Sequence, residues 1–95
     1  MLLNVVKKGE IVSCRLSTGE ELVGTLREED KNEITIEQPL IVGRSENGLG
    51  LMPYMMTIEP ESTVKISTSQ VMSMAATGEE VAKGYKKQTS KIVSL

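Results

Sequence analysis

The fold is decided by residues 11–36, whose sequence is IVSCRLSTGEELVGTLREEDKNEITI. Apolar and polar residues alternate there in three short runs, and each run predicts a strand with one buried and one exposed face. Polar segments at residues 17–20 and 29–32 separate the runs and are typical of turns. The stretch therefore predicts a three-stranded antiparallel meander. Its apolar face must be covered, or closed on itself, by the rest of the chain.

The remaining pattern extends this meander. We expect strands at about residues 10–17, 20–28, 33–38, 63–67 and 71–76. Pro39 has no N–H group, so the third strand should be interrupted there or lie at an edge. Gly24 falls on the inward side of the second strand, where it permits a bend, with a bulge as the alternative. An enlarged hairpin fills residues 40–58, with Asn47 and Gly48 at its tip.

Residues 77–93 predict a C-terminal helix. Thr77 and Glu80 have the spacing of a capping box, and Tyr85 lies on an apolar stripe. The predicted fold class is therefore all-β. We expect a small, strongly bent, five-stranded antiparallel barrel over residues 10–76, with the enlarged central hairpin and this helix, in a single domain.

The composition excludes several kinds of site. The chain has 95 residues and no His, Trp or Phe, so histidine triads and most zinc sites are excluded. It shows no nucleophile–base pair, no phosphate-binding glycine loop and no spaced metal ligands, so we expect no enzyme activity, no metal and no cofactor. The acidic run at residues 28–30 lacks the spacing of a calcium-binding loop. Cys14 alternates with apolar neighbours and should be a small buried hydrophobic residue.

Hydropathy and charge bound the partners. No apolar run approaches the roughly 20 residues that a membrane-spanning helix needs, and a single cysteine fits a reducing compartment. We therefore expect a cytoplasmic protein without membrane contact. The net charge of −2 gives no global attraction to nucleic acid. However, residues 1–77 carry a net −4 and residues 78–95 a net +2, so any contact with a polyanion should be local.

Residues 49–58, LGLMPYMMTI, are apolar on both faces. A strand that is apolar on two sides needs two covers, and the core of the domain can supply one. The simplest second cover is a neighbouring copy of the chain, and the expected oligomer interface consists of Met52, Tyr54, Met55 and Met56. The alternative is that this segment packs under the C-terminal helix.

Two segments resemble the motifs of a known family. Residues 12–30 resemble the first Sm motif through the pattern Val12-x-Cys14-x-Leu16-x-x-Gly19-x-Glu21-Leu22-x-Gly24-x-Leu26-x-x-x-Asp30. Residues 64–74, VKISTSQVMSM, are similar to the second Sm motif in their apolar spacing. The layout also resembles Sm-like proteins of marine phage origin, with which it shares Gln38-Pro39, the segment 52–55 and a helix that carries Tyr85.

This resemblance implies an Sm-like barrel that pairs edge strands into a homo-oligomeric ring of about five to seven subunits. It also implies binding of RNA or single-stranded nucleic acid, in RNA metabolism or regulation, and in the host cytoplasm if the chain is phage-encoded. By position in the motifs, the nucleic-acid-binding residues would be Lys31, Asn32, Lys65 and Ser67.

The chain departs from the RNA-binding members of that family at their contact positions. Glu29 stands in place of a base-stacking aromatic residue, Ile34 in place of a base-reading asparagine, and Ser67-Thr68 in place of Arg-Gly. The family's uridine pocket is therefore not carried over. The alternative function is a non-enzymatic structural or protein-binding ring with no nucleic-acid role.

Overall fold

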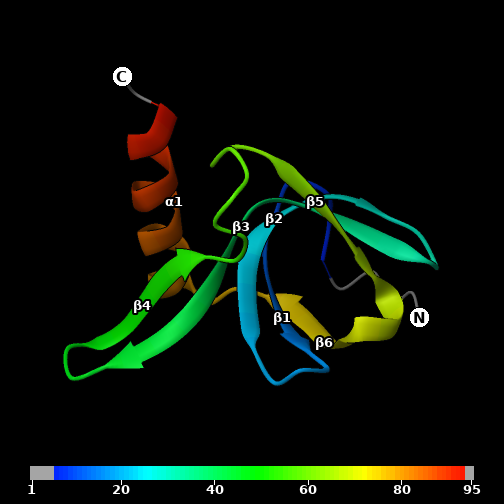
Figure 1. The fold of residues 1–95 in the computed structure, drawn as a ribbon, viewed down its shortest axis with the longest axis horizontal. Coiled ribbons are helices and arrows are strands. Elements are labelled where there is room, and N and C mark those ends of the chain that lie inside the picture. Colours follow the sequence, from blue (N-terminus) through cyan, green and yellow to red (C-terminus); the bar gives the residue numbers. More distant parts are fainter. Residues whose placement is uncertain (1–5, 94–95) are drawn as a thin grey trace.

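The computed structural model describes residues 6–93, with side chains over residues 6–90. This part of the chain forms an antiparallel β-sheet of six strands and one C-terminal helix (Figure 1). The elements are β1 (Ile11–Leu16), β2 (Glu21–Glu29), β3 (Glu33–Ser45), β4 (Gly48–Pro53), β5 (Thr63–Ser67), the 3₁₀ turn η1 (Thr68–Gln70), β6 (Val71–Ala76) and α1 (Glu79–Val93). The expected all-β architecture with a C-terminal helix is confirmed at this level.

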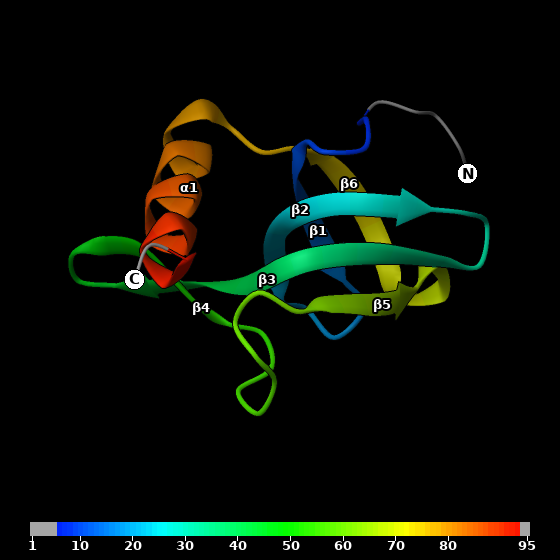
Figure 2. The same ribbon diagram turned by 90° about the horizontal axis from the view of Figure 1, so that it is seen from above.

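The sheet is bent but not closed. Its strand order is β4-β3-β2-β1-β6, and β5 pairs with β3 beside this path. Seen from above, the bent strands β2 and β3 run side by side with β5 (Figure 2). The strand count of five was too low by one, because both arms of the central hairpin join the sheet as β3 and β4.

Strand β3 continues through Pro39, where the sequence predicted an interruption or an edge. Gln38 takes a positive φ of 52°, which kinks the strand just before the proline. Before the kink, β3 pairs with β5, and after it β3 pairs with β4, while β2 runs along both halves. The missing N–H of Pro39 is tolerated because the pairing with β2 resumes at Leu40, opposite Val23.

Gly24 allows β2 to follow this kink. The register of β2 against β3 shifts between Val23 and Thr25, so the irregularity is of the bulge type, which was the alternative to the predicted bend. Gly24 is buried, and a Cβ atom there would overlap Cγ2 of Ile36 and lie 3.3 Å from the carbonyl oxygen of Glu37. The two strands can approach this closely only because the residue has no side chain.

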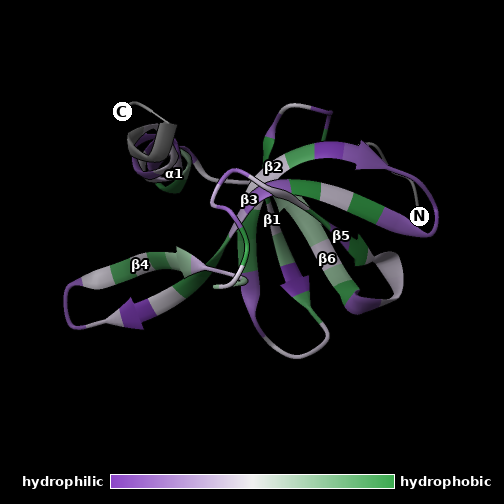
Figure 3. Ribbon diagram, turned by 45° about the horizontal axis from the view of Figure 1, so that its top comes forward, coloured by the Kyte–Doolittle hydropathy of each residue, from purple (hydrophilic) through white to green (hydrophobic). Residues whose placement is uncertain are grey.

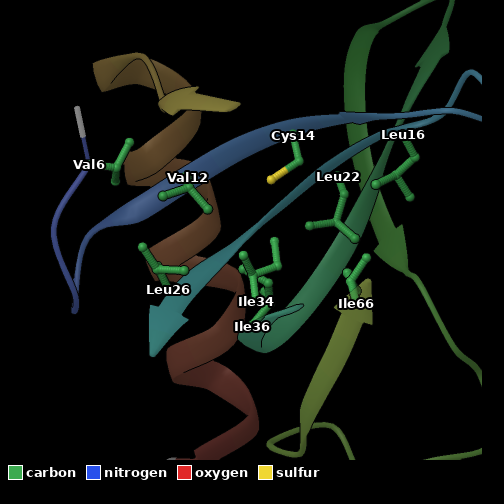
Figure 4. Packing of buried hydrophobic residues seen from close by; sticks show 9 residues of the cluster. All are labelled: Val6, Val12, Cys14, Leu16, Leu22, Leu26, Ile34, Ile36 and Ile66. Carbon is green, nitrogen blue, oxygen red and sulfur yellow. The ribbon is translucent and has the colours of Figure 1, made fainter. Parts of the chain in front are cut away.

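The main core lies inside the bend of the sheet (Figure 4). Its side chains come from the β1–β2–β3 meander, with Ile66 from β5 and Val6 from the segment before β1, and they are Val6, Val12, Cys14, Leu16, Leu22, Leu26, Ile34, Ile36 and Ile66. Cys14 is 1% exposed, which confirms the expected burial. Burial, with a smaller contribution from the charge of Glu29, raises the pKa of its thiol to about 11.

A second, smaller core fixes α1 on the other side of β2 and β3. Tyr85 is 2% exposed and packs with Val23 and Leu40. Its hydroxyl lies 2.9 Å from the carbonyl oxygen of Glu37 and 3.1 Å from that of Gln38, and can donate its one hydrogen to either. The helix is therefore attached at the kink of β3 by a buried aromatic ring and its hydroxyl group.

The start of α1 differs from the predicted capping box. The helix begins at Glu79, and the amide of Ala82 donates to the carbonyl of Gly78. The hydroxyl of Thr77 lies instead 2.8 Å from that of Ser13 on β1. Thr77 thus connects the chain before the helix to the sheet, and the two glutamates of the first turn suit the positive end of the helix dipole.

Replacing Gly24 with alanine should destabilise the protein by about 1–3 kcal/mol, because the added methyl group overpacks a site that Ile36 already fills. Urea unfolding followed by circular dichroism measures the change. The matched control is Gly43→Ala in β3, where a Cβ atom would meet nothing within 4 Å and the change should stay within about 0.5 kcal/mol. Equal unfolding midpoints for the two variants would contradict the close approach of β2 and β3.

Candidate nucleic-acid interface

Two turns that are far apart in the sequence meet at one corner of the molecule, at the right of Figure 1. The amide of Thr68 in η1 donates to the carbonyl of Asn32 at 2.9 Å, and the Thr68 hydroxyl donates to the carbonyl of Lys31 at 2.8 Å. The β2–β3 turn and the β5–η1 junction are thereby fixed to each other. We refer to residues 30–33 together with residues 65–69 as the polar corner.

The polar corner contains all four residues that the sequence pointed to as nucleic-acid contacts. Lys31, Asn32, Lys65 and Ser67 are exposed. Ser67 lies opposite Glu33 in the pairing of β3 with β5 and caps η1, because its side chain accepts from the amide of Ser69. The Ser67 and Ser69 hydroxyls lie 2.8 Å apart. Ser69 is a further member of this surface that motif reasoning missed.

Asp30 shapes the β2–β3 turn. Its Oδ1 atom accepts hydrogen bonds from the amides of Asn32 at 2.7 Å and Glu33 at 2.9 Å. These two bonds lower the pKa of the Asp30 carboxyl below its ordinary value of 3.8. Asp30 thus serves to hold the turn that presents Lys31 and Asn32 to solvent.

The charges of the polar corner nearly cancel. Lys65 Nζ lies 3.3 Å from Glu33 Oε2 in an exposed cross-strand ion pair. Within the part of the chain that the structure describes, Lys31 forms no ion pair. Attraction to phosphate is therefore weak, and Lys31 is the residue best placed to supply it.

The structure places two of the positions at which the chain departs from the Sm pattern, Ile34 and Glu29. Ile34 is 2% exposed and belongs to the main core, so this position cannot read a base. Glu29 ends β2, only partly buried, and puts a carboxylate beside the turn. A ligand at this corner would have to be held through its backbone, because no aromatic ring is available there for stacking.

The β3–β4 hairpin, which leads into the predicted oligomer interface, extends away from the rest of the sheet and carries hydrophobic residues (Figure 3). Met52, Met55 and Met56 are 57%, 42% and 85% exposed, whereas Tyr54 is partly buried against the main core. The alternative, packing under the helix, describes the opposite face of the hairpin, because Leu51 packs in the second core. Packing near the helix is therefore confirmed for the face that carries Leu51, and the oligomer interface stays a prediction.

Sequence reasoning also missed a cleft of about 790 Å³ between α1, the β3–β4 hairpin and the β1–β2 turn. Its walls include Val42, Leu51 and Val81, and its rim carries Arg15 and Arg44. No local signal marks such a cleft, because it forms where an exposed hairpin diverges from a helix about 40 residues away.

Comparisons with known proteins do not assign a family. A scan against protein-family models finds no match, and a search of curated proteins finds no significant match. Among the described residues, no group of three or more acidic or cysteine side chains is arranged to hold a metal ion. Within the same part of the chain, no helix has the length and apolar character needed to cross a bilayer.

Replacing Asp30 with asparagine tests how the turn is held. The folded protein lowers the pKa of Asp30, so its contribution to stability is present above the ordinary value of 3.8 and is lost as the pH falls through the folded pKa. Wild type should therefore be more stable than Asp30→Asn at neutral pH, and the difference should shrink in acid. Urea unfolding midpoints of both proteins, taken from neutral pH down to below 3.8, measure this difference in stability. A difference that does not depend on pH would contradict the assigned role of the carboxylate.

Proposed function

We propose that this chain is a subunit of a homo-oligomeric, Sm-like ring that binds single-stranded nucleic acid, RNA in the first place, and has no catalytic activity. The observation that carries the proposal is the polar corner. There, hydrogen bonds from Thr68 join the turn that ends the first Sm-like pattern to the turn inside the second. The two segments that resemble Sm motifs therefore form one surface.

The topology supports an Sm-like barrel. Without β4, the strand order is β5-β3-β2-β1-β6, which is a strip of five antiparallel strands. The two end strands, β5 and β6, are joined by the single turn η1 and so lie near each other. A bent strip whose ends are held together in this way has the form of a barrel that is open between β5 and β6. The β3–β4 hairpin is then an extension of that barrel.

The free edges of β5 and β6 support a ring. Among residues 6–93, each of these strands has one partner, β3 for β5 and β1 for β6. The carbonyl of Ser62 accepts from the amide of Gln38, and the amide of Thr68 donates to the carbonyl of Asn32, so both backbone groups point toward β3 and the turn before it. Backbone groups alternate in direction along a strand, so those of Thr63, Lys65 and Ser67 point away from β3. Pairing of this edge with β6 of the next copy is a head-to-tail contact, and repeated around an axis it closes a ring.

A backbone-directed mode of binding suits the polar corner. It presents Lys31, Asn32, Lys65 and two serine hydroxyl groups, which are donors that suit phosphate and sugar oxygens. A ring would repeat this surface in every subunit. Repetition would compensate for the weak attraction of a single copy, in which acidic and basic side chains balance.

Substituting Lys31 and Lys65 with glutamine should weaken RNA binding by the chain. For single strands the salt dependence falls by about 0.7 per phosphate contact, so the slope of log affinity against log salt should decrease in magnitude by about 1.4. Fluorescence polarisation with U-rich and A-rich oligonucleotides at low salt measures it. The control is Arg15→Gln with Arg44→Gln, which removes the same charge at the cleft beside α1, again from one ion-paired and one unpaired residue. Absence of salt-sensitive binding by wild type at micromolar protein would contradict the proposed ligand.

Substituting Thr63 with proline tests the ring. Proline removes an outward N–H group from the edge of β5 and leaves the bonds to β3 in place. We expect Thr63→Pro to lower the subunit number in native mass spectrometry, while Thr63→Val, which keeps the N–H group, retains the assembly. Folding of both variants is checked by circular dichroism. An unchanged assembly in a folded Thr63→Pro protein would show that this edge is not the contact.

The second candidate is a structural or protein-binding ring without nucleic acid. It is favoured by the ion pair of Lys65 with Glu33 and by the carboxylates of Glu28, Glu29 and Asp30 near the same corner. Capture of partners from a host lysate, with and without nuclease, separates the two functions. Partners that remain after nuclease treatment would favour the protein-binding ring.

A further inference from the structure

Positive charge is unevenly paired over the described surface. Four basic residues in and next to the sheet form ion pairs. The pairs are Lys8–Glu28, Arg15–Glu21, Arg27–Glu37 and Lys65–Glu33. In contrast, Lys83, Lys86 and Lys87 of α1 are exposed, and none of them is ion-paired among the side chains that the structure describes. Of the six basic residues without an ion pair among the described side chains, three are therefore grouped on α1, and the other three, Lys7, Lys31 and Arg44, lie at separate places in the sheet region.

These lysines share the outer face of α1. Lys86 and Lys87 follow Lys83 by three and four residues, so all three lie within about one helical turn. Tyr85 occupies the opposite, buried side, with its hydroxyl bonded at the kink of β3. Lys83 follows Glu79 by four residues, a spacing that stabilises a helix. Lys86 and Lys87 have no acidic residue three or four positions away, and both repel Lys83, so helix stability does not explain these two lysines.

The helix lies far from the polar corner. In Figures 1 and 2, α1 stands at one end of the long axis of the molecule, and the β2–β3 turn with η1 stands at the other. The longest extent of the chain is 35 Å, which a single strand of nucleic acid can cross. The two surfaces can therefore act as separate contacts that mutations can distinguish.

We propose that the outer face of α1, which carries Lys83, Lys86 and Lys87, is a second contact for the phosphate backbone of single-stranded nucleic acid. This inference rests on the proposed function and adds a surface that neither Sm-like pattern contains. The lysines act as point charges that displace counterions from the strand. Binding there adds affinity without sequence preference.

An anionic membrane fits this face less well. A helix that lies in the membrane interface needs an exposed apolar side, whereas the apolar side of α1 is turned inward with Tyr85 2% exposed. The exposed Met55 and Met56 lie beside Thr89 of the helix, but Glu59 lines the same hollow and would repel anionic headgroups. The observations therefore favour nucleic acid as the partner.

The test uses the full chain and four proteins. They are wild type, a triple variant Lys83→Gln, Lys86→Gln and Lys87→Gln, the same three positions changed to arginine, and a control triple variant Lys7→Gln, Lys8→Gln and Arg44→Gln. The probe is a U-rich RNA of about 16 nucleotides, the upper site size of a small single-strand-binding domain. Affinity is measured over a salt series, and circular dichroism checks that each protein is folded.

The proposal predicts that the helix glutamine variant lowers the magnitude of the salt slope by about 2, three lysines at about 0.7 each. The arginine variant should keep the wild-type slope, and the control should differ from wild type much less than the helix glutamine variant does. A helix glutamine variant that matches the control would overturn the proposal and leave the proposed function standing. Failure of wild type itself to bind RNA would overturn both.

Two further probes identify a wrong partner. Phosphatidylcholine vesicles that contain phosphatidylserine, and a polyglutamate peptide, are tested against the same four proteins. If the helix glutamine variant loses binding to either of these while its RNA slope is unchanged, the lysine face recognises lipid or acidic protein, and the proposal is wrong.

Discussion

Gln38 holds a kink in β3 that separates the part of the strand paired with β5 from the part paired with β4. A non-glycine residue at positive φ costs about 1–3 kcal/mol and persists only where its surroundings hold it. Here the amide of Gln38 donates to the carbonyl of Ser62, and its own carbonyl lies 3.1 Å from the Tyr85 hydroxyl. These contacts fix the point at which β3 changes partner: the residues before Gln38 pair with β5, and the residues after Pro39 pair with β4.

The kink divides the apolar side chains into two groups. Inside the bend lies the main core, and on the outer side lies the smaller core under α1. The β3–β4 hairpin extends beyond both, which is why Met52 remains 57% exposed although the sequence around it is apolar on two faces. Methionine suits such a surface, since its flexible side chain adapts to a partner. The bent strip also ends in two strands, β5 and β6, whose outer edges have no partner within the described chain.

Local pattern predicted the regular parts of the fold. The strands β5 and β6 fall on residues 63–67 and 71–76 as expected, because strict alternation and polar turns define them. The passage of β3 through Pro39 has no local signal, since it requires the distant strand β2 to resume its pairing at Leu40. Likewise, no local rule states that Lys31 and Thr68 touch. The polar corner was predicted only through the resemblance of two segments to Sm motifs. The predicted capping role of Thr77 is wrong, because its hydroxyl group lies within hydrogen-bonding distance of the Ser13 hydroxyl.

The proposed ring requires that the open edge of β5 is covered by another copy of the chain. Amide hydrogen exchange on the assembled protein tests it residue by residue. Val64 and Ile66 face β3 and should be protected in any folded state. In the proposed ring, the outward amides of Lys65 and Ser67 are protected as well, because the next copy of the chain pairs with them. Rapid exchange at those two amides, with Val64 and Ile66 still protected, would contradict it.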